Sequence, residues 1–377
     1  MTHRCDCQDI RSTRLDPQGL AIHARVKHVR HLLGQLLAEC PELVGTQGDA
    51  LLVRGDLVPL LRRLCAALTY NQRQEARAAP WDGQTVDFSR SASLAVWVDR
   101  LDSPWFAAAA EALHFLVQPI FDLTDGAVHG HEALVRARLG GRDIPAGALL
   151  QAAEAHDQMA AFDARARSQA ITQAYPRLAT ERLFINFSPT VIYDPDICLG
   201  ATFRTCAETG ADPSRLVFEV TEAHAFPDLA LLRRILDRYR AEGAHVALDD
   251  MGSGHTSLLY LSALRPDYVK LDRGLLSGIA DGDPRVALVG ALIRYAHDLG
   301  VQVIAEGIEA REELQIVHAL GADLAQGYFL ARPAAEPASL SVEARAYFSA
   351  EGARPARPHA FESSPVRPRT SGAAADE

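Results

Sequence analysis

The sequence contains few cysteines, and they follow no regular pattern. The cysteines are Cys5, Cys7, Cys40, Cys65, Cys198 and Cys206 in a chain of 377 residues. A small secreted scaffold depends on a dense disulfide framework, so this pattern argues against that class and favours a reducing compartment, the cytoplasm. Cys5 and Cys7 could bind a metal ion or sense the redox state, but incidental thiols near a chain end explain them as well.

The sequence also lacks a long apolar run and an excess of positive charge. Its most apolar stretch, residues 104–121, is interrupted by polar residues and a proline, which argues against a transmembrane helix. Residues 1–16 have no apolar core, which argues against a signal peptide. The net charge of -10 argues against binding to nucleic-acid polymers or to anionic membranes. If the substrate is a polyanion, we expect the protein to recruit cations to meet it.

Residues 1–103 predict a mainly helical N-terminal domain. Val29, Leu33 and Leu36 recur at helical spacing within residues 23–40, and residues 56–77 continue in the same way. A turn-rich patch follows, and the sequence Asp102-Ser103-Pro104 breaks the next helical segment. We therefore predict a domain boundary at residue 103.

From Pro104 onward, short apolar runs alternate with longer amphipathic segments. The runs cover residues 115–123, 128–137, 182–188, 215–222, 244–250, 267–272, 301–309 and 323–330. Eight strands alternating with helices predict a (β/α)8 barrel over residues 104–345. The first two runs are joined only by Thr124-Asp125-Gly126, which is typical of a hairpin, so we expect one antiparallel strand. Residues 346–377 lack periodic apolar residues and are predicted to be a disordered tail.

Polar side chains interrupt these runs or lie near their ends, and Glu132 stands inside its run. They are Glu132, Asn186, Glu219, Glu222, Asp249, Asp250, Lys270, Glu306 and Gln326. In a parallel barrel such ends converge on one face, where catalytic residues sit. A ring of acids would repel itself unless divalent cations bind, and hard oxygen ligands suit Mg2+ or Mn2+. Any single acid could instead be a surface residue or a helix-capping residue.

The adjacent pair Asp249-Asp250 indicates which class of reaction the site could catalyse. Asp249 could bridge two ions while Asp250 serves the second, and a pair of metal ions can clamp both oxygens of a phosphoryl displacement. Lys270, close by in the predicted face, could orient the attacking water. The pattern therefore favours metal-assisted phosphodiester hydrolysis.

The same residues stand in a series of recognisable motifs. These are QPI at Gln118, EALVR at Glu132, NFS at Asn186, EVTE at Glu219, DDMGSGHTSL at Asp249, PDYVKLD around Lys270, AEGIE at Glu306 and AQGYFLARP at Gln326. In order and spacing, residues 104–333 resemble the EAL domain of cyclic-di-GMP phosphodiesterases. The resemblance implies a (β/α)8-type barrel with one antiparallel strand, and hydrolysis of cyclic-di-GMP to linear pGpG.

The resemblance also implies roles for individual residues. Glu132, Asn186, Glu219 and Asp249 would ligate one Mg2+ or Mn2+ ion, and Asp249 with Asp250 would ligate a second. Lys270 would hold the attacking water, and Glu306 would help to accept its proton. The positions expected to contact the dinucleotide are Gln118, Leu134, Arg136 and Gln326. Glu222 would hold the loop that follows Asp250.

That loop departs from the usual family sequence DDFGTGYSSL. Here Met251, Ser253, His255 and Thr256 replace the usual residues. Some EAL domains act without catalysis, so the alternative is a weak or inactive domain that serves as a cyclic-di-GMP receptor or a protein-interaction module. A further alternative is an unrelated barrel metalloenzyme that acts on another phosphate substrate.

The resemblance carries expectations for assembly and regulation as well. Family members dimerise through the EAL domain, so we expect a homodimer. They commonly carry a sensory or regulatory domain ahead of EAL, so an unknown signal or protein partner is expected at residues 1–103. No GGDEF-like synthase signature occurs there.

Overall fold

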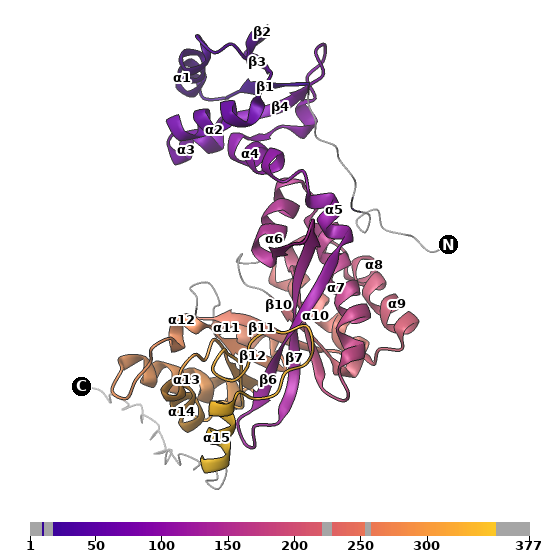
Figure 1. Ribbon diagram of the computed structural model, residues 1–377, viewed down its shortest axis with the longest axis vertical. Coiled ribbons are helices and arrows are strands. Elements are labelled where there is room, and N and C mark those ends of the chain that lie inside the picture. The colour runs from indigo at the N-terminus through magenta and orange to yellow at the C-terminus, as the bar shows by residue number, and fades with distance from the viewer. Residues whose placement is uncertain (1–9, 11–17, 221–227, 253–257, 352–377) are drawn as a thin grey trace, which may run out of the picture.

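The computed structural model describes residues 10, 18–220, 228–252 and 258–351. Figure 1 shows an N-terminal unit at one end of the long axis and a larger barrel at the other. The N-terminal strands are β1 (Gly19–His23), β2 (Leu43–Gln47), β3 (Ala50–Arg54), β4 (Arg77–Trp81) and β5 (Ala92–Ser93). They form an antiparallel sheet in the order β2-β3-β1-β4-β5.

Helices accompany this sheet, as the sequence predicted. They are α1 (Lys27–Leu37), α2 (Leu57–Ala67), α3 (Tyr70–Glu75) and α4 (Leu94–Asp102). Helix α1 buries Val29, Leu33 and Leu37 at four-residue spacing. The sheet itself was not predicted, because most of β1 and β3 is buried and neither strand shows the polar alternation that marks a half-exposed strand. Apart from the short α3 between α2 and β4, the order β1-α1-β2-β3-α2-β4 is that of a split βαβ unit.

The predicted barrel is confirmed. Its strands are β6 (Leu113–Asp122), β7 (Val128–Leu139), β9 (Arg182–Phe187), β10 (Leu216–Val220), β11 (His245–Met251), β12 (Tyr268–Leu271), β13 (Gln302–Ala305) and β14 (Leu324–Ala325). The sheet closes because β6 pairs with both β7 and β14. Both of these pairings are antiparallel and the other barrel pairings are parallel, so β6 is the expected antiparallel strand. Strand β8 (Arg142–Pro145) pairs with β7 outside the closed barrel.

Helices surround the barrel (Figure 1). They are α5 (Phe106–Glu111), α6 (Ala146–Ala155), α7 (Met159–Gln173), α8 (Pro195–Cys198), α9 (Gly200–Thr209), α10 (Leu229–Ala241), α11 (Leu258–Leu264), α12 (Arg273–Leu276), α13 (Pro284–Asp298), α14 (Arg311–Ala319) and α15 (Val342–Glu351). None of the helices in the described ranges has both the length and the apolar character needed to cross a membrane.

Helix α15 corrects the predicted start of the tail. It runs to Glu351, so residues 346–351 are helical rather than part of a disordered tail. Phe348 packs against the β6–β7 hairpin, where a Cβ atom on Gly126 would lie 2.8 Å from the Phe348 ring. This contact with the barrel stabilises a helix that has weak amphipathic character in the sequence. Residues 352–377 lie outside the described part of the chain.

The N-terminal unit is joined to the barrel through α4 and α6. Arg100 on α4 is buried, and its guanidinium donates hydrogen bonds to the carbonyl oxygen of Ala155 and to the carboxylate of Asp157. The ring of His156 lies with Nε2 3.0 Å from the carbonyl oxygen of Ser103. Ala155 ends α6 and Ser103 follows α4, so these side chains meet carbonyl groups at helix ends, which lack partners within their helices.

The lower interior of the barrel is filled by apolar side chains from successive strands. This cluster consists of Ile120, Phe184, Val217, Ala247, Tyr268, Ile304 and Leu324. At the matching level of β7 stands Gly130, where a Cβ atom would lie 2.6 Å from the Phe184 ring. The barrel is therefore a packed core at this level, and any site must lie above it.

Candidate metal and substrate site

The polar residues predicted from the sequence form the next layer of the barrel interior. Successive strand residues alternate between the two faces, so a residue two positions from an apolar interior residue also points inward. The resulting pairs are Ile120 with Gln118, Gly130 with Glu132, Phe184 with Asn186, Val217 with Glu219, Ala247 with Asp249, Tyr268 with Lys270, Ile304 with Glu306, and Leu324 with Gln326. Polar residues thus follow the apolar layer on every barrel strand, with Glu306 and Gln326 standing directly after the ends of β13 and β14.

Lys270 lies at the centre of this layer. Its Nζ is 2.6 Å from Glu306 Oε1, 3.0 Å from Glu219 Oε1, 3.4 Å from Asp249 Oδ1 and 3.5 Å from Glu132 Oε2. Burial would lower the pKa of Lys270, but the surrounding carboxylates outweigh it and raise that pKa well above the usual value. The lysine therefore carries a full positive charge although only 1 % of it is exposed.

Two amide groups fix the orientation of Glu132. Asn186 Nδ2 donates to Glu132 Oε1 at 2.8 Å, and Gln326 Nε2 donates to Oε2 at 2.9 Å. Burial opposes ionisation of Glu132, but the Lys270 charge and these hydrogen bonds prevail and lower its pKa. Asn186 keeps its carbonyl oxygen for another ligand while its amide nitrogen holds the carboxylate.

The carboxylate of Glu219 is buried without a hydrogen-bond donor among the described residues. It is completely buried, and neither carboxylate oxygen accepts a hydrogen bond within the described residues, although Lys270 Nζ is within ion-pair distance. Burial raises the pKa of Glu219 well above its ordinary value. A buried carboxylate without hydrogen-bond donors is costly unless a cation compensates it. The residues present therefore fit a bound divalent cation.

The local backbone brings Asp249 and Asp250 into one site. Neighbouring strand residues normally point to opposite faces, but the pairing of β11 with β12 is irregular between Leu248 and Met251. Asp250 has a φ of 56°, in the left-handed region, and its N–H donates to Asp249 Oδ1 at 2.9 Å. As a result, one carboxylate oxygen from each of Asp249, Asp250 and Glu306 lies within 4.8 Å of the others.

The carboxylates of the site outnumber its cation. Burial raises the pKa of Glu306 well above normal and that of Asp249 to a lesser degree, despite Lys270. Burial, followed by the charge of Asp249, raises the pKa of Asp250 to about 6. This set consists of hard oxygen donors, which suit Mg2+ or Mn2+ better than zinc. One lysine cannot neutralise the cluster, which is the electrostatic reason to expect cations.

The expected substrate contacts lie beside this layer. Leu134 and Arg136 continue the inward face of β7 beyond Glu132 and are partly exposed. Gln118 is buried, and its Nε2 donates to the carbonyl oxygen of Ala331 at 3.2 Å. Gln326 holds Glu132, which sequence reasoning did not foresee for a residue expected to contact the dinucleotide.

Part of the predicted set lies outside the described residues. This applies to Glu222, Ser253, His255 and Thr256, and to Cys5 and Cys7. Met251 is buried in the core of the barrel domain. The described cysteines Cys40, Cys65, Cys198 and Cys206 are free thiols.

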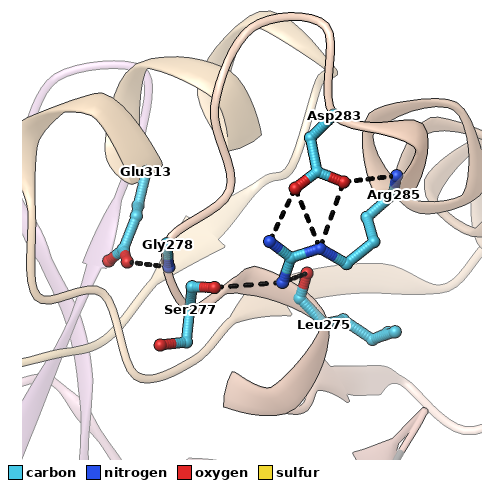
Figure 2. Close-up of polar contacts among 6 residues, drawn as sticks. All are labelled: Leu275, Ser277, Gly278, Asp283, Arg285 and Glu313. Atoms are coloured by element: carbon cyan, nitrogen blue, oxygen red, sulfur yellow. Dashed lines mark hydrogen bonds and ion pairs between the residues drawn. The ribbon is translucent and has the colours of Figure 1, made fainter.

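Sequence reasoning missed a support behind the site, Glu313 on α14. Its carboxylate accepts the N–H of Gly278 at 2.7 Å and the N–H of Glu309 at 2.7 Å. These bonds join the turn after α12 to the loop that carries Glu306. Figure 2 shows Glu313 reaching Gly278, and nearby Arg285 donating to the carbonyl oxygen of Ser277. In the sequence Glu313 is one of two acids in the first turn of α14, a common position for acids that does not single it out.

Comparison with known proteins identifies the family of this barrel. The model of the EAL domain matches residues 106–333. The chain belongs to the EAL-domain family. A cyclic di-GMP phosphodiesterase of Pseudomonas aeruginosa is 30% identical over 230 residues, which are 59% of this chain and 38% of that relative. The chain spans about a third of the length of the curated relatives that it matches.

Solved structures of EAL proteins have the same fold. A standalone EAL protein of Vibrio cholerae O395, in its c-di-GMP-bound form, is 31% identical with a TM-score of 0.58, and the match covers 63% of this chain and 97% of that one. The manganese and cyclic-di-GMP complex of Klebsiella pneumoniae BlrP1 is 28% identical with a TM-score of 0.56, over 61% of this chain and 58% of that one. A BlrP1 complex with calcium gives the same values.

Proposed function

We propose that this EAL protein is a cyclic-di-GMP phosphodiesterase that opens one phosphodiester bond with the help of Mg2+ or Mn2+ and releases linear pGpG. The observation that carries the proposal is the convergence of Glu132, Glu219, Asp249 and Glu306 around Lys270 in one layer of the barrel. The cyclic-di-GMP-bound relatives support the choice of substrate.

The carboxylates and one amide would hold a pair of cations. Glu132, Asn186, Glu219 and Asp249 would ligate the first ion, and Asp249 with Asp250 the second. Bound ions of this kind polarise a phosphodiester and lower the pKa of an attacking water. The fixed orientation of Glu132 and the unmet oxygens of Glu219 support this assignment.

Lys270 and Glu306 would handle the attacking water. The Lys270 ammonium can hold the water oxygen and offset charge on the phosphate. Glu306, 2.6 Å from that ammonium, has a pKa raised by burial, which makes it a stronger proton acceptor than an exposed glutamate. We assign the two residues to positioning the water and to accepting its proton.

The dinucleotide would lie against β6, β7 and the loop after β14. Arg136 suits a phosphodiester because its planar guanidinium can donate two parallel hydrogen bonds. Gln118, Leu134 and Gln326 would complete the contacts. Gln326 would also orient Glu132, and Glu222 would support the loop after Asp250.

The proposal extends to assembly and control. We expect a cytoplasmic homodimer formed through the EAL domain, with residues 1–103 receiving a signal or a protein partner. The bonds from Arg100 to Ala155 and Asp157 offer a route from the N-terminal unit to α6, next to the strand that carries Glu132. The altered loop after Asp250 keeps the receptor alternative open as an outcome of the test.

Turnover of cyclic-di-GMP by the full chain tests the proposal. With Mn2+ or Mg2+, the wild type should form pGpG, and Glu132→Ala should lose more than about a hundredfold in kcat/KM because removing even an outer-shell partner of a metal ligand typically costs 10–100-fold. Glu154→Ala, an exposed glutamate on α6, is the matched control and should keep full activity. Binding of cyclic-di-GMP without any pGpG would favour the receptor alternative.

A further inference from the structure

Strands β6 and β7 continue above the metal-site layer as one wall of the barrel mouth. Their register pairs Gln118 with Glu132, Leu116 with Leu134, and His114 with Arg136. The alternate residues of β6, Leu113, Phe115 and Val117, are buried on the opposite face. Consequently His114 and Leu116 face the same side as the predicted substrate contacts on β7.

His114 has ring nitrogens available to a ligand. Its side chain is 28% exposed and makes no hydrogen bond within the described part of the chain. The closest acid is Asp143, whose Oδ1 lies 3.8 Å from His114 Nε2. That carboxylate is already bound by Arg138 through two hydrogen bonds of 2.7 and 3.1 Å.

The surroundings of His114 are cationic and suit an anionic group. Burial lowers the pKa of His114, Asp143 offsets this in part, and Arg138, Arg136 and Arg177 lower it further. The imidazole is therefore neutral near pH 7 and can donate one N–H. Arg136 stands directly opposite on β7, so one ligand group could accept from both side chains.

The His114–Arg136 pair lies some distance along the strands from the metal-site layer, where the proposed bond cleavage takes place. The His114–Arg136 row is four residue steps along the strands from the Gln118–Glu132 row, which corresponds to roughly 13 Å. We infer that His114 is a substrate-binding residue that, together with Arg136, holds the phosphodiester group of the cyclic dinucleotide that is not being hydrolysed. This inference rests on the proposed function. His114 precedes the QPI motif, so no motif in the sequence pointed to it.

Steady-state kinetics on the full chain test this role. His114→Leu should raise KM for cyclic-di-GMP about tenfold, the effect of losing a hydrogen bond to a charged group, with kcat within about twofold. His114→Gln keeps an N–H donor and should restore KM to within about threefold of the wild type. His31→Leu, an exposed histidine on α1, is the matched control and should leave both constants unchanged.

The outcomes separate this inference from the proposed function. A wild type that turns over normally, with His114→Leu unchanged in KM, would overturn the role of His114 alone. A fall in kcat without a rise in KM would also overturn it, because that result places the residue in the chemical step. A wild type that neither binds nor hydrolyses cyclic-di-GMP would remove the proposed function and this inference together. Equal melting temperatures of the variants would show that they fold.

Discussion

Asp250 combines an unfavourable backbone with a place in the carboxylate cluster. Its φ of 56° lies in the left-handed region, which costs a non-glycine residue on the order of 1 kcal/mol or more. The neighbouring Asp249 adds electrostatic repulsion in the absence of metal. Metal ligation by Asp250 would offset both of these costs.

Replacing Asp250 with glycine should therefore separate stability from metal binding. In metal-free protein, Asp250→Gly should raise the free energy of unfolding by about 1 kcal/mol, while affinity for Mn2+ falls at least tenfold. Arg265→Gly is the matched control, because exposed Arg265 also has a positive φ of 42° but lies outside the site. Denaturant unfolding and calorimetric Mn2+ titration measure the two effects. Loss of stability in Asp250→Gly would contradict the account.

Lys270 neutralises part of the cluster when no metal is bound. Removing one partner of a buried ion pair costs about 3–5 kcal/mol, so Lys270→Met should be strongly destabilised in chelator. Added Mn2+ should recover most of that loss, because the cation replaces the missing charge. Lys27 and Lys270 are the lysines of the sequence, and exposed Lys27→Met on α1 serves as the control. Thermal melts with and without Mn2+ measure this effect. An equal loss of melting temperature in Lys270→Met under both conditions would contradict the prediction.

The sequence predicts which residues form the site better than it predicts the contacts between them. The site residues could be predicted because each is a polar side chain that interrupts an apolar run, as Glu132 does, or stands near the end of one, as Asn186 and Lys270 do. The bonds from Asn186 and Gln326 to Glu132 could not, because they depend on the distance between strands far apart in sequence. The positive φ of Asp250 could not be predicted either, since positive φ is uncommon for any non-glycine residue, although aspartate is enriched there.

At the scale of elements, glycine at position 130 allows β7 to approach its neighbour. A Cβ atom there would lie 2.6 Å from the Phe184 ring and 2.9 Å from the carbonyl oxygen of Arg182. Gly130→Ala should therefore cost about 1–3 kcal/mol through overpacking. Gly34→Ala is the control, because nothing lies within 4 Å of a Cβ atom at that position of α1, and it should stabilise by up to about 1 kcal/mol. Chemical denaturation of both variants gives the comparison, and a neutral Gly130→Ala would refute the packing argument.

The barrel strands were predictable, and the N-terminal sheet was not. Runs such as residues 182–188 end in polar residues and are separated by segments of helical periodicity. Together these features indicate both the type of each element and where it ends. Strand β1 is only five residues long and almost entirely buried, so its sequence GLAIH resembles a piece of helix as much as a strand. Helix α15 was missed for a similar reason, because tertiary packing rather than local pattern stabilises it.

For the whole molecule, the carboxylate cluster links stability to pH. Burial raises the pKa of Glu219 in the folded protein, so the folded state holds a proton that the unfolded chain releases above about pH 4.5. The stability that this protonated form contributes is therefore lost as pH rises through the folded pKa. In chelator, Glu219→Gln should match the wild type near pH 4.5 and become increasingly more stable than it toward pH 8.

Melting temperatures of both proteins across this range measure the difference. Histidines with a lowered pKa, such as His129 at about 4, act in the opposite direction, but they act in both proteins and cancel. Saturating Mn2+ should reverse the order at pH 8, because the protein that retains Glu219 has the complete ligand set of the first ion and gains more stability from binding it. A difference that does not change with pH would show that the cluster is not strained by charge.

The central claim is that the polar layer of this barrel holds two divalent cations against a cyclic dinucleotide. Anomalous scattering from crystals grown with Mn2+ and cyclic-di-GMP tests it most directly. The account predicts two manganese peaks, one among Glu132, Asn186, Glu219 and Asp249, and one between Asp249 and Asp250. Absence of manganese from this layer, or manganese only at other places on the molecule, would contradict it.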